Sequence, residues 1–230
     1  MCLVPGGSRI REALRRQMQH GKVLRPMRGS YARAAYWRAL SKPQQVIHIL
    51  RTLQNLHPDW VFCHESAAVV LGLPVPFEKL DFVHVATTLA NRNAAAGIVK
   101  WHIVDRNEPV IVQGLRVTSL QRTVFDCMRT ADFKQALAVA DASLRLSGNA
   151  SNAFVSYFKR IGGTCTGAPR AVRTMRYADA RSESGGESIA RAVMIQQGFA
   201  LPELQVALPQ PLNPRRMYRV DFLWTRLDGS

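Results

Sequence analysis

The chain has 230 residues, of which 47% are hydrophobic, and it carries a formal net charge of +15 at pH 7. Enough apolar side chains are present to form an ordinary buried core, in one large domain or two small ones. The first residues contain no apolar run long enough for a signal peptide, and no segment approaches the roughly 20 apolar residues of a membrane span. The composition therefore excludes an integral membrane protein and indicates a soluble globular chain, which we expect in the cytoplasm without a membrane partner.

The positive charge is concentrated near the N-terminus. Residues 1–57 contain eleven lysines and arginines against one acid, residues 58–150 contain nine of each, and residues 151–230 contain eleven basic against six acidic residues. An even spread would favour solubility, whereas a concentrated excess favours a polyanionic partner. Both ends of the chain can therefore face nucleic acid, and we expect double-stranded DNA as the partner. The sequence does not identify a protein partner.

A basic helix followed by a hairpin is predicted near the N-terminus. Residues 8–20 place Ile10, Leu14 and Met18 on one helical face and basic side chains on the opposite face, and residues 22–31 are typical of a β-hairpin. A helix and a hairpin of this kind read base edges and hold phosphates, respectively. The alternative is a solvated basic helix without a partner. The side chains that we expect to contact DNA are Arg9, Arg11, Arg15, Arg16, Gln19, Lys22, Arg25 and Arg28.

A mixed sheet between helices is predicted for the centre of the chain. Strands are expected at residues 82–86, 98–104, 110–112 and 115–117, with a tight hairpin turn at Gln113-Gly114. Helices are expected at 43–57, 64–72, 119–129, 133–147, 150–160 and 168–180. The helix at 43–57 presents a broad apolar face on which the helix at 8–20 could pack. Arg122 and Asp126 are spaced for an ion pair within one helix, and residues 162–167 are the best candidate linker. We therefore predict an α+β fold with domains at 1–57, 58–160 and 168–230.

His64 and Glu65 follow a short predicted strand at residues 60–62. One interpretation is a catalytic pair. The other is that His64 orders a strand-to-helix turn by hydrogen bonding, and the residues alone leave both interpretations open. The cysteines show no Cys-x-x-Cys spacing and no paired histidines, so neither a zinc site nor a disulfide framework is indicated. They are Cys2, Cys63, Cys127 and Cys165. We therefore expect no cofactor at these residues.

The C-terminal segment combines an acidic residue on a helix with another on a strand. Ser184 and Glu187 form a capping-box pattern at the start of a helix, and strands are expected at 203–208 and 217–224, the second carrying Asp221. Carboxylates so placed can hold Mg²⁺ against a scissile phosphate. The alternative interpretation is that Glu187 only caps its helix and that Asp221 is an ordinary acidic residue on an edge strand.

This segment resembles the restriction-endonuclease-like PD-(D/E)XK fold in its very-short-patch-repair-like form. The resemblance implies catalytic positions at Glu187, Gln205 and Asp221, with Asp221 as a metal ligand. The family also has a strand with Glu-x-Lys or Glu-x-Asp-Gly, whereas this chain ends at Leu-Asp-Gly-Ser. We therefore expect an incomplete nuclease-like core that is inactive as given, with Mg²⁺ relevant only if the missing strand is supplied.

Two further strings, His64 to Pro74 and Gly114 to Asp126, resemble the AbiEi-type family of antitoxins and transcriptional regulators. The resemblance implies that an N-terminal winged helix binds operator DNA and represses the operon of a type IV toxin–antitoxin pair. Ser8 to Tyr31 then corresponds to the recognition helix and wing, and the winged helix is expected to be partial. It also implies a mixed α/β middle before the nuclease-like end.

The leading expectation is thus a DNA-binding transcriptional regulator that is not an enzyme as it stands. The alternative is a metal-dependent DNA endonuclease of the restriction-endonuclease-like fold, active only with its missing strand. A third hypothesis is a protein-interaction module built on the sheet at residues 82–117.

Overall fold

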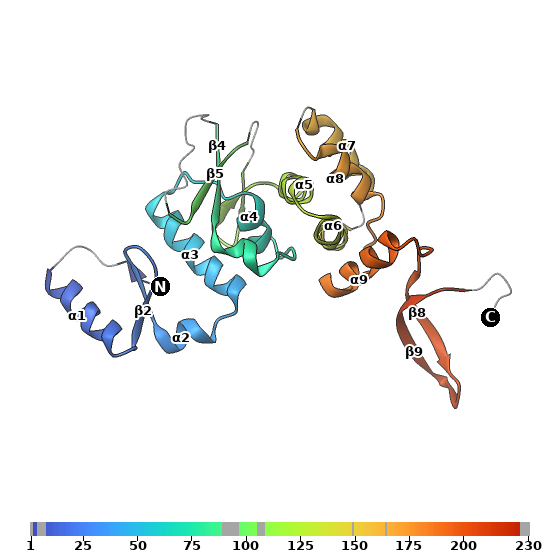
Figure 1. The fold of residues 1–230 in the computed structure, drawn as a ribbon, viewed down its shortest axis with the longest axis horizontal. Coiled ribbons are helices and arrows are strands. Elements are labelled where there is room, and N and C mark those ends of the chain that lie inside the picture. The colour runs from blue at the N-terminus through green and yellow to red at the C-terminus, as the bar shows by residue number, and fades with distance from the viewer. Residues whose placement is uncertain are drawn as a thin grey trace. The chain divides into compact units, whose positions relative to one another are not determined.

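The computed structural model describes residues 2–3, 8–88, 97–104, 109–148, 150–163 and 165–225 (Figure 1). It has an α+β fold, as predicted, with several small sheets among the helices. The chain divides into two compact units, residues 1–119 and residues 120–230. None of the helices in the described ranges is long and apolar enough to cross a membrane.

The first unit begins with a small antiparallel sheet and one helix. The elements are β1 (Cys2–Leu3), α1 (Ser8–Gln19), β2 (Val23–Met27) and β3 (Ser30–Arg33), and the strand order is β1-β3-β2. Gly29 lies in the left-handed region at φ +81°, where a residue without Cβ makes the turn between β2 and β3 without strain. The predicted helix and hairpin are both present.

Two helices follow, and the second enters the core of the unit. They are α2 (Ala34–Ala39), which the sequence analysis did not predict, and α3 (Lys42–Leu56). Ser41 and Gln44 form a reciprocal capping box that fixes the start of α3. The expectation that α3 would cover the apolar face of α1 is wrong. Ile10 and Met18 stay 48% and 39% exposed, and α1 packs on β2.

The second sheet of the first unit is built from two strand pairs that one residue, Phe62, connects. The elements are α4 (His64–Val70), the 3-10 turn η1 (Phe77–Asp81), β4 (Val83–Thr87), β5 (Val99–Ile103), β6 (Val110–Val112) and β7 (Leu115–Val117). β4 and β5 are parallel, while β6 and β7 are antiparallel around the predicted Gln113-Gly114 turn. Phe62 bridges β4 and β7 and is fully buried, so a single residue replaces the predicted strand at 60–62.

The core of the first unit lies between this sheet and the helices α3 and α4. Its apolar side chains come from both helices and from the strands. They are Val46, Leu50, Leu53, Phe62, Ala67, Val69, Val70, Leu80, Val83, Val85, Val99, Leu115 and Val117. Met27 of β2 packs against the edge of the same core, which attaches the N-terminal hairpin to the unit.

The second unit is a helical group that ends in a hairpin. Its elements are α5 (Leu120–Thr130), α6 (Phe133–Ser147), α7 (Ser151–Gly162), α8 (Ala168–Met175), α9 (Gly185–Gln196), β8 (Glu203–Gln210) and β9 (Asn213–Leu223). Figure 1 shows β8 and β9 as one antiparallel ribbon that follows α9. The predicted central segment is shared between the units, because α5, α6 and α7 belong with the C-terminal elements.

The connection between α7 and α8 is a tight turn inside the second unit. Gly167 has φ +84°, and a Cβ there would lie 2.1 Å from the carbonyl oxygen of Arg129, so only glycine fits this close approach. The helix predicted at 168–180 is shorter than expected and ends at Met175. Segment 162–167 therefore joins two packed helices of one unit.

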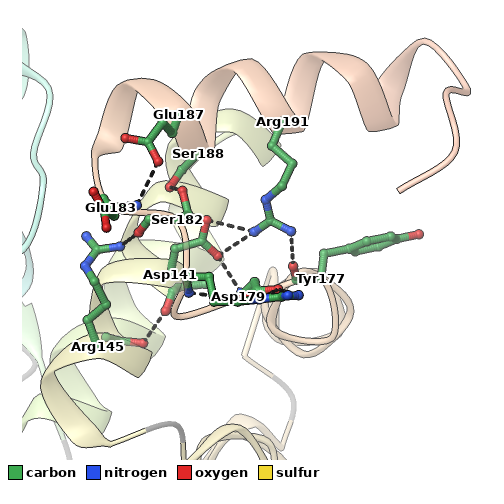
Figure 2. Close-up of polar contacts among 12 residues, drawn as sticks. Asp141, Arg145, Tyr177, Asp179, Ser182, Glu183, Glu187, Ser188 and Arg191 are labelled. Atoms are coloured by element: carbon green, nitrogen blue, oxygen red, sulfur yellow. Dashed lines mark hydrogen bonds and ion pairs between the residues drawn. The ribbon is translucent and has the colours of Figure 1, made fainter. Parts of the chain in front are cut away.

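A buried ion pair fixes α9 against α6 (Figure 2). Arg191 donates from Nη2 to both carboxylate oxygens of Asp141, at 2.6 and 2.8 Å, and from Nη1 to the carbonyl oxygen of Tyr177 at 2.7 Å. Asp141 also accepts the Asp179 amide at 2.8 Å. Burial raises the pKa of Asp141, and the Arg191 guanidinium opposes that rise. Both charges are satisfied only while α6, α9 and the intervening loop are held together.

Removing the positive partner of this pair should destabilise the second unit strongly. Arg191→Met leaves a buried carboxylate without its cation, which costs about 3–5 kcal/mol of unfolding free energy in urea titrations at pH 7. The loss should shrink as the pH falls, because a protonated Asp141 needs no cation. Arg181→Met is the matched control, since Arg181 pairs with Asp179 at 2.8 Å with its side chain 60% exposed, and should cost less than about 1 kcal/mol. Equal losses in the two variants would contradict this assignment.

Candidate functional site

All eight side chains predicted to contact DNA are exposed, and they come from α1, the following turn and the β2–β3 hairpin. They are Arg9, Arg11, Arg15, Arg16, Gln19, Lys22, Arg25 and Arg28. Glu12 lies in the same helix and approaches Arg16 at 3.5 Å, with both side chains well exposed. The local charge therefore stays strongly positive and faces solvent.

The helix and the hairpin share one hollow. It has a volume of about 500 Å³ and is lined by Arg11, Arg15, Met18, Gln19, Arg25 and Tyr31. Four of the predicted side chains are thus brought together around a concave surface with no acidic residue in its lining. Arg9, Arg16, Lys22 and Arg28 do not line it. The hollow joins a helical face to a strand, which sequence spacing alone did not predict.

The three residues predicted to resemble a nuclease site also meet. Gln205 donates from Nε2 to Glu187 Oε2 at 3.0 Å and to Asp221 Oδ1 at 3.1 Å. Glu187 comes from the first turn of α9, whereas Gln205 and Asp221 come from the facing strands β8 and β9. The amide therefore bridges two carboxylates that are 34 residues apart in the chain.

Glu187 is a helix cap and a member of this cluster at the same time. Ser184 accepts the Glu187 amide at 3.1 Å, Ser184 Oγ donates to Glu187 Oε1 at 2.8 Å, and the Glu183 amide donates to Glu187 Oε2 at 2.9 Å. Burial alone raises the pKa of Glu187, but these hydrogen bonds and the one from Gln205 hold the pKa below its ordinary value. The two interpretations of Glu187 left open by the sequence are thus compatible.

Gln205 is held in an unusual backbone conformation. Its φ of +57° lies in the left-handed region that a side chain with Cβ rarely adopts, and its Oε1 is buried with no hydrogen-bond partner among the described residues. The amide N–H₂ group, rather than the oxygen, faces the two carboxylates. In this orientation the cluster is a hydrogen-bonded network, whereas a rotated amide would present three converging oxygens of the kind that Mg²⁺ prefers.

Neighbouring charges that the sequence analysis missed support the cluster. Arg219 of β9 pairs with Glu183 at 2.6 Å. Arg145 of α6 donates to the carbonyl oxygen of Ser182 and adds positive charge near Glu187. Only the register of β9 and the packing of α6 bring these arginines close, so no local spacing could have indicated them.

A second polar cluster surrounds the start of α4 in the first unit. Glu65 is buried, with its carboxylate 3.5 Å from His84 Nδ1 and 3.3 Å from Lys79 Nζ. Burial lowers the pKa of His84 to about 4 despite the nearby Glu65. Burial raises the pKa of Glu65, but His84, its backbone hydrogen bond, His64 and Lys79 together leave it lowered. His64 and Glu65 were candidates from the sequence, whereas His84 of β4 and His102 of β5 were not.

Comparison with known proteins gives relatives without an assigned activity. No family model matches the sequence. Two proteins of Mycobacterium tuberculosis, from strains CDC 1551 / Oshkosh and ATCC 25618 / H37Rv and both named as uncharacterized, are each 36% identical to this chain over 113 residues. The match covers 49% of this chain and 41% of each relative, so the chain spans less than half of their length. These relatives indicate similarity over part of the chain and give no activity.

Loss of the Gln205 amide should raise the pKa of Glu187. In Gln205→Leu one of the donors that stabilise the carboxylate is absent, so the carboxyl carbon of Glu187 should titrate at higher pH in ¹³C NMR. Because the wild-type pKa is depressed, the contribution of Glu187 to stability is present above its ordinary pKa and is lost as the pH falls through the depressed value. In the variant this contribution should be smaller, and its loss should be complete at a higher pH than in the wild type.

Gln210→Leu is the matched control for this titration. Gln210 lies on the same hairpin and donates to Tyr218 Oη at 2.8 Å. An unchanged Glu187 titration in Gln205→Leu, or an equal change in Gln210→Leu, would show that Gln205 does not bridge the carboxylates in solution.

Proposed function

We propose that this chain binds double-stranded DNA through α1 and the β2–β3 hairpin and acts as a transcriptional regulator. The observation that carries the proposal is the hollow lined by Arg11, Arg15, Gln19 and Arg25, where a helix and a hairpin present cationic and amide donors together. Such donors match the phosphate oxygens and base edges of a duplex.

The dimensions and charge of the region support a groove-binding mode. An α-helix with its side chains is about 10–12 Å across, and the B-DNA major groove is about 12 Å wide. Arg15 and Gln19 are exposed on α1 and suit base edges, since arginine pairs with guanine and glutamine with adenine. Arg25 and Arg28 are exposed on the hairpin and suit the phosphates on one side of the groove.

The regulatory part of the proposal rests on the resemblance to AbiEi-type antitoxins. The first string covers the whole of α4 and the residues that follow it, and the second runs from the turn before β7 into α5, so both belong to the scaffold of the fold. On this proposal the chain works in the cytoplasm and represses an operon by occupying operator DNA. Its protein partner, if it acts as an antitoxin, is the toxin of the same operon.

Neutralising the hairpin should reduce the salt dependence of DNA binding. Arg25→Gln with Arg28→Gln removes two phosphate contacts, so the slope of log K against log salt should become shallower by about 2 in fluorescence-anisotropy titrations. The matched control is Arg173→Gln with Arg176→Gln, which removes the same charge from exposed positions in the second unit. Equal slopes for the hairpin variant and wild type would remove the hairpin from the interface.

The second candidate function is a metal-dependent endonuclease, favoured by the meeting of Glu187, Gln205 and Asp221. Phosphodiester cleavage needs a cation held by several converging oxygens, and Asp221 is the candidate metal ligand. In the described residues, however, the Glu187 oxygens already accept hydrogen bonds from the helix cap, and Gln205 presents N–H groups to both acids. We therefore favour the regulator, with the cluster as a nuclease-like scaffold.

A nicking assay separates the two functions. Supercoiled plasmid incubated with the chain and Mg²⁺ or Mn²⁺ should remain intact, because two hydrogen-bonded carboxylates leave Mg²⁺ mostly hydrated and loosely placed. Asp221→Ala is run beside the wild type so that contaminating nucleases are recognised. Nicking by the wild type that disappears in Asp221→Ala would establish the endonuclease in place of the inactive scaffold.

A further inference from the structure

Four side chains with nitrogen or sulfur donors gather where α4 meets the parallel pair β4–β5. Cys63 immediately precedes α4 and His64 is its first residue. His84 lies on β4 and His102 on β5, and the register pairs His84 with Lys100 and Ala86 with His102. His84 and His102 therefore lie on the same face of the sheet, at diagonal positions. Segments far apart in the sequence thus bring a thiol and three imidazoles together.

The separations within this cluster are short. His64 Nδ1 lies 3.3 Å from Cys63 Sγ, and His84 Nδ1 lies 2.8 Å from His102 Nε2. The rings of His64 and His102 stack with their centroids 3.8 Å apart and their planes at 25°. One donor atom from each of Cys63, His64 and His102 lies within 4.8 Å of the other two.

We propose that Cys63, His64 and His102 bind a divalent transition-metal ion of the zinc class. In a tetrahedral zinc site, bonds of about 2.3 Å to sulfur and about 2.0–2.1 Å to nitrogen place two nitrogens about 3.3–3.4 Å apart and a sulfur and a nitrogen about 3.6 Å apart. The 3.3 Å between Cys63 Sγ and His64 Nδ1 is close to the sulfur–nitrogen spacing. The third donor, from His102, lies within 4.8 Å of the other two, so a small movement of the side chains is needed for all three to reach one ion. The thiol releases its proton to solvent when the metal binds.

The choice of metal follows from the donor atoms. A thiolate with two imidazoles suits zinc or cobalt, whereas Mg²⁺ and Ca²⁺ prefer oxygen. The site is therefore chemically distinct from the Glu187–Gln205–Asp221 cluster, and it does not depend on the proposed DNA-binding function. His102 is half-buried, whereas Cys63 and His64 are buried.

His84 and Glu65 have the arrangement of groups that orient a metal-bound histidine. His84 contacts His102 through Nδ1 at 2.8 Å, and the same nitrogen lies 3.5 Å from the Glu65 carboxylate, which also has Lys79 at 3.3 Å. Metal-binding histidines usually pass a hydrogen bond to such a second group, which fixes the ring orientation. His84 is thus a positioning residue for His102.

The backbone at His64 is consistent with a ligand held in place by its surroundings. His64 has φ +48°, in the left-handed region, and its side chain is 2% exposed. Non-glycine residues in this region occur where the surrounding structure fixes them, and they cluster at functional sites. In this conformation His64 Nδ1 lies 3.3 Å from the thiol of the preceding residue.

Cobalt titration tests the site directly, since a thiolate bound to Co²⁺ gives a charge-transfer band in the near ultraviolet. The reduced, chelator-treated chain should develop this band with one equivalent of Co²⁺ and lose it when Zn²⁺ displaces the cobalt. Cys63→Ser should abolish the band, and His84→Gln should retain it while lowering the affinity about 10–100-fold. Cys165→Ser is the matched control, because Cys165 is an exposed cysteine outside the cluster.

A second measurement uses only the wild-type chain, so it does not depend on whether the variants fold. One equivalent of Zn²⁺ should shift the imidazole ¹⁵N resonances of His64 and His102, while those of His48 and His57, which lie outside the cluster, stay unchanged. Absence of the cobalt band in the folded wild type, persistence of the band in Cys63→Ser, or equal shifts of all histidines would each overturn the proposal.

Discussion

Asp141 and Arg191 are 50 residues apart in the chain, and both are buried. They form an ion pair in which Arg191 Nη2 donates to both carboxylate oxygens of Asp141. A charge buried without its partner is strongly destabilising, so neither residue can be satisfied unless α6 and α9 lie together. Figure 2 shows Glu187 on the same helix as Arg191, in the first turn of α9. Because Glu187 also accepts a hydrogen bond from Gln205, the ion pair helps to position the Glu187–Gln205–Asp221 cluster without being part of it.

The first unit uses its polar groups in two opposite ways. The cations of α1 and the hairpin are solvent-exposed, so they remain available to a polyanion at little desolvation cost. Glu65 and His84 are instead buried, and the Glu65 carboxylate has Lys79 at 3.3 Å and His84 at 3.5 Å beside it. The exposed set suits a large charged partner, and the buried set suits a small ion held by a few converging atoms.

Local patterns explain the elements that the sequence predicted well. The Ser184–Glu187 cap, the Gln113-Gly114 turn and the Arg122–Asp126 ion pair each depend on residues no more than four positions apart. Predictions failed where packing decided the outcome. Helix α8 ends at Met175, although no glycine or proline there predicted its end. Helix α1 packs on β2 and leaves Ile10 exposed, whereas the sequence suggested that α3 would cover it.

The sequence by itself determined the α+β class and the concentration of positive charge in the first 57 residues, and it singled out Glu187, Gln205 and Asp221, which the structure brings together. These follow from composition, periodicity and a family resemblance, all of which can be read along the chain. Tertiary structure alone decided that Asp141 faces Arg191, that His84 and His102 join Cys63 and His64, and that Gln205 takes a left-handed backbone. Each of these depends on the packing and register of distant segments, for which no spacing in the sequence carries a signal.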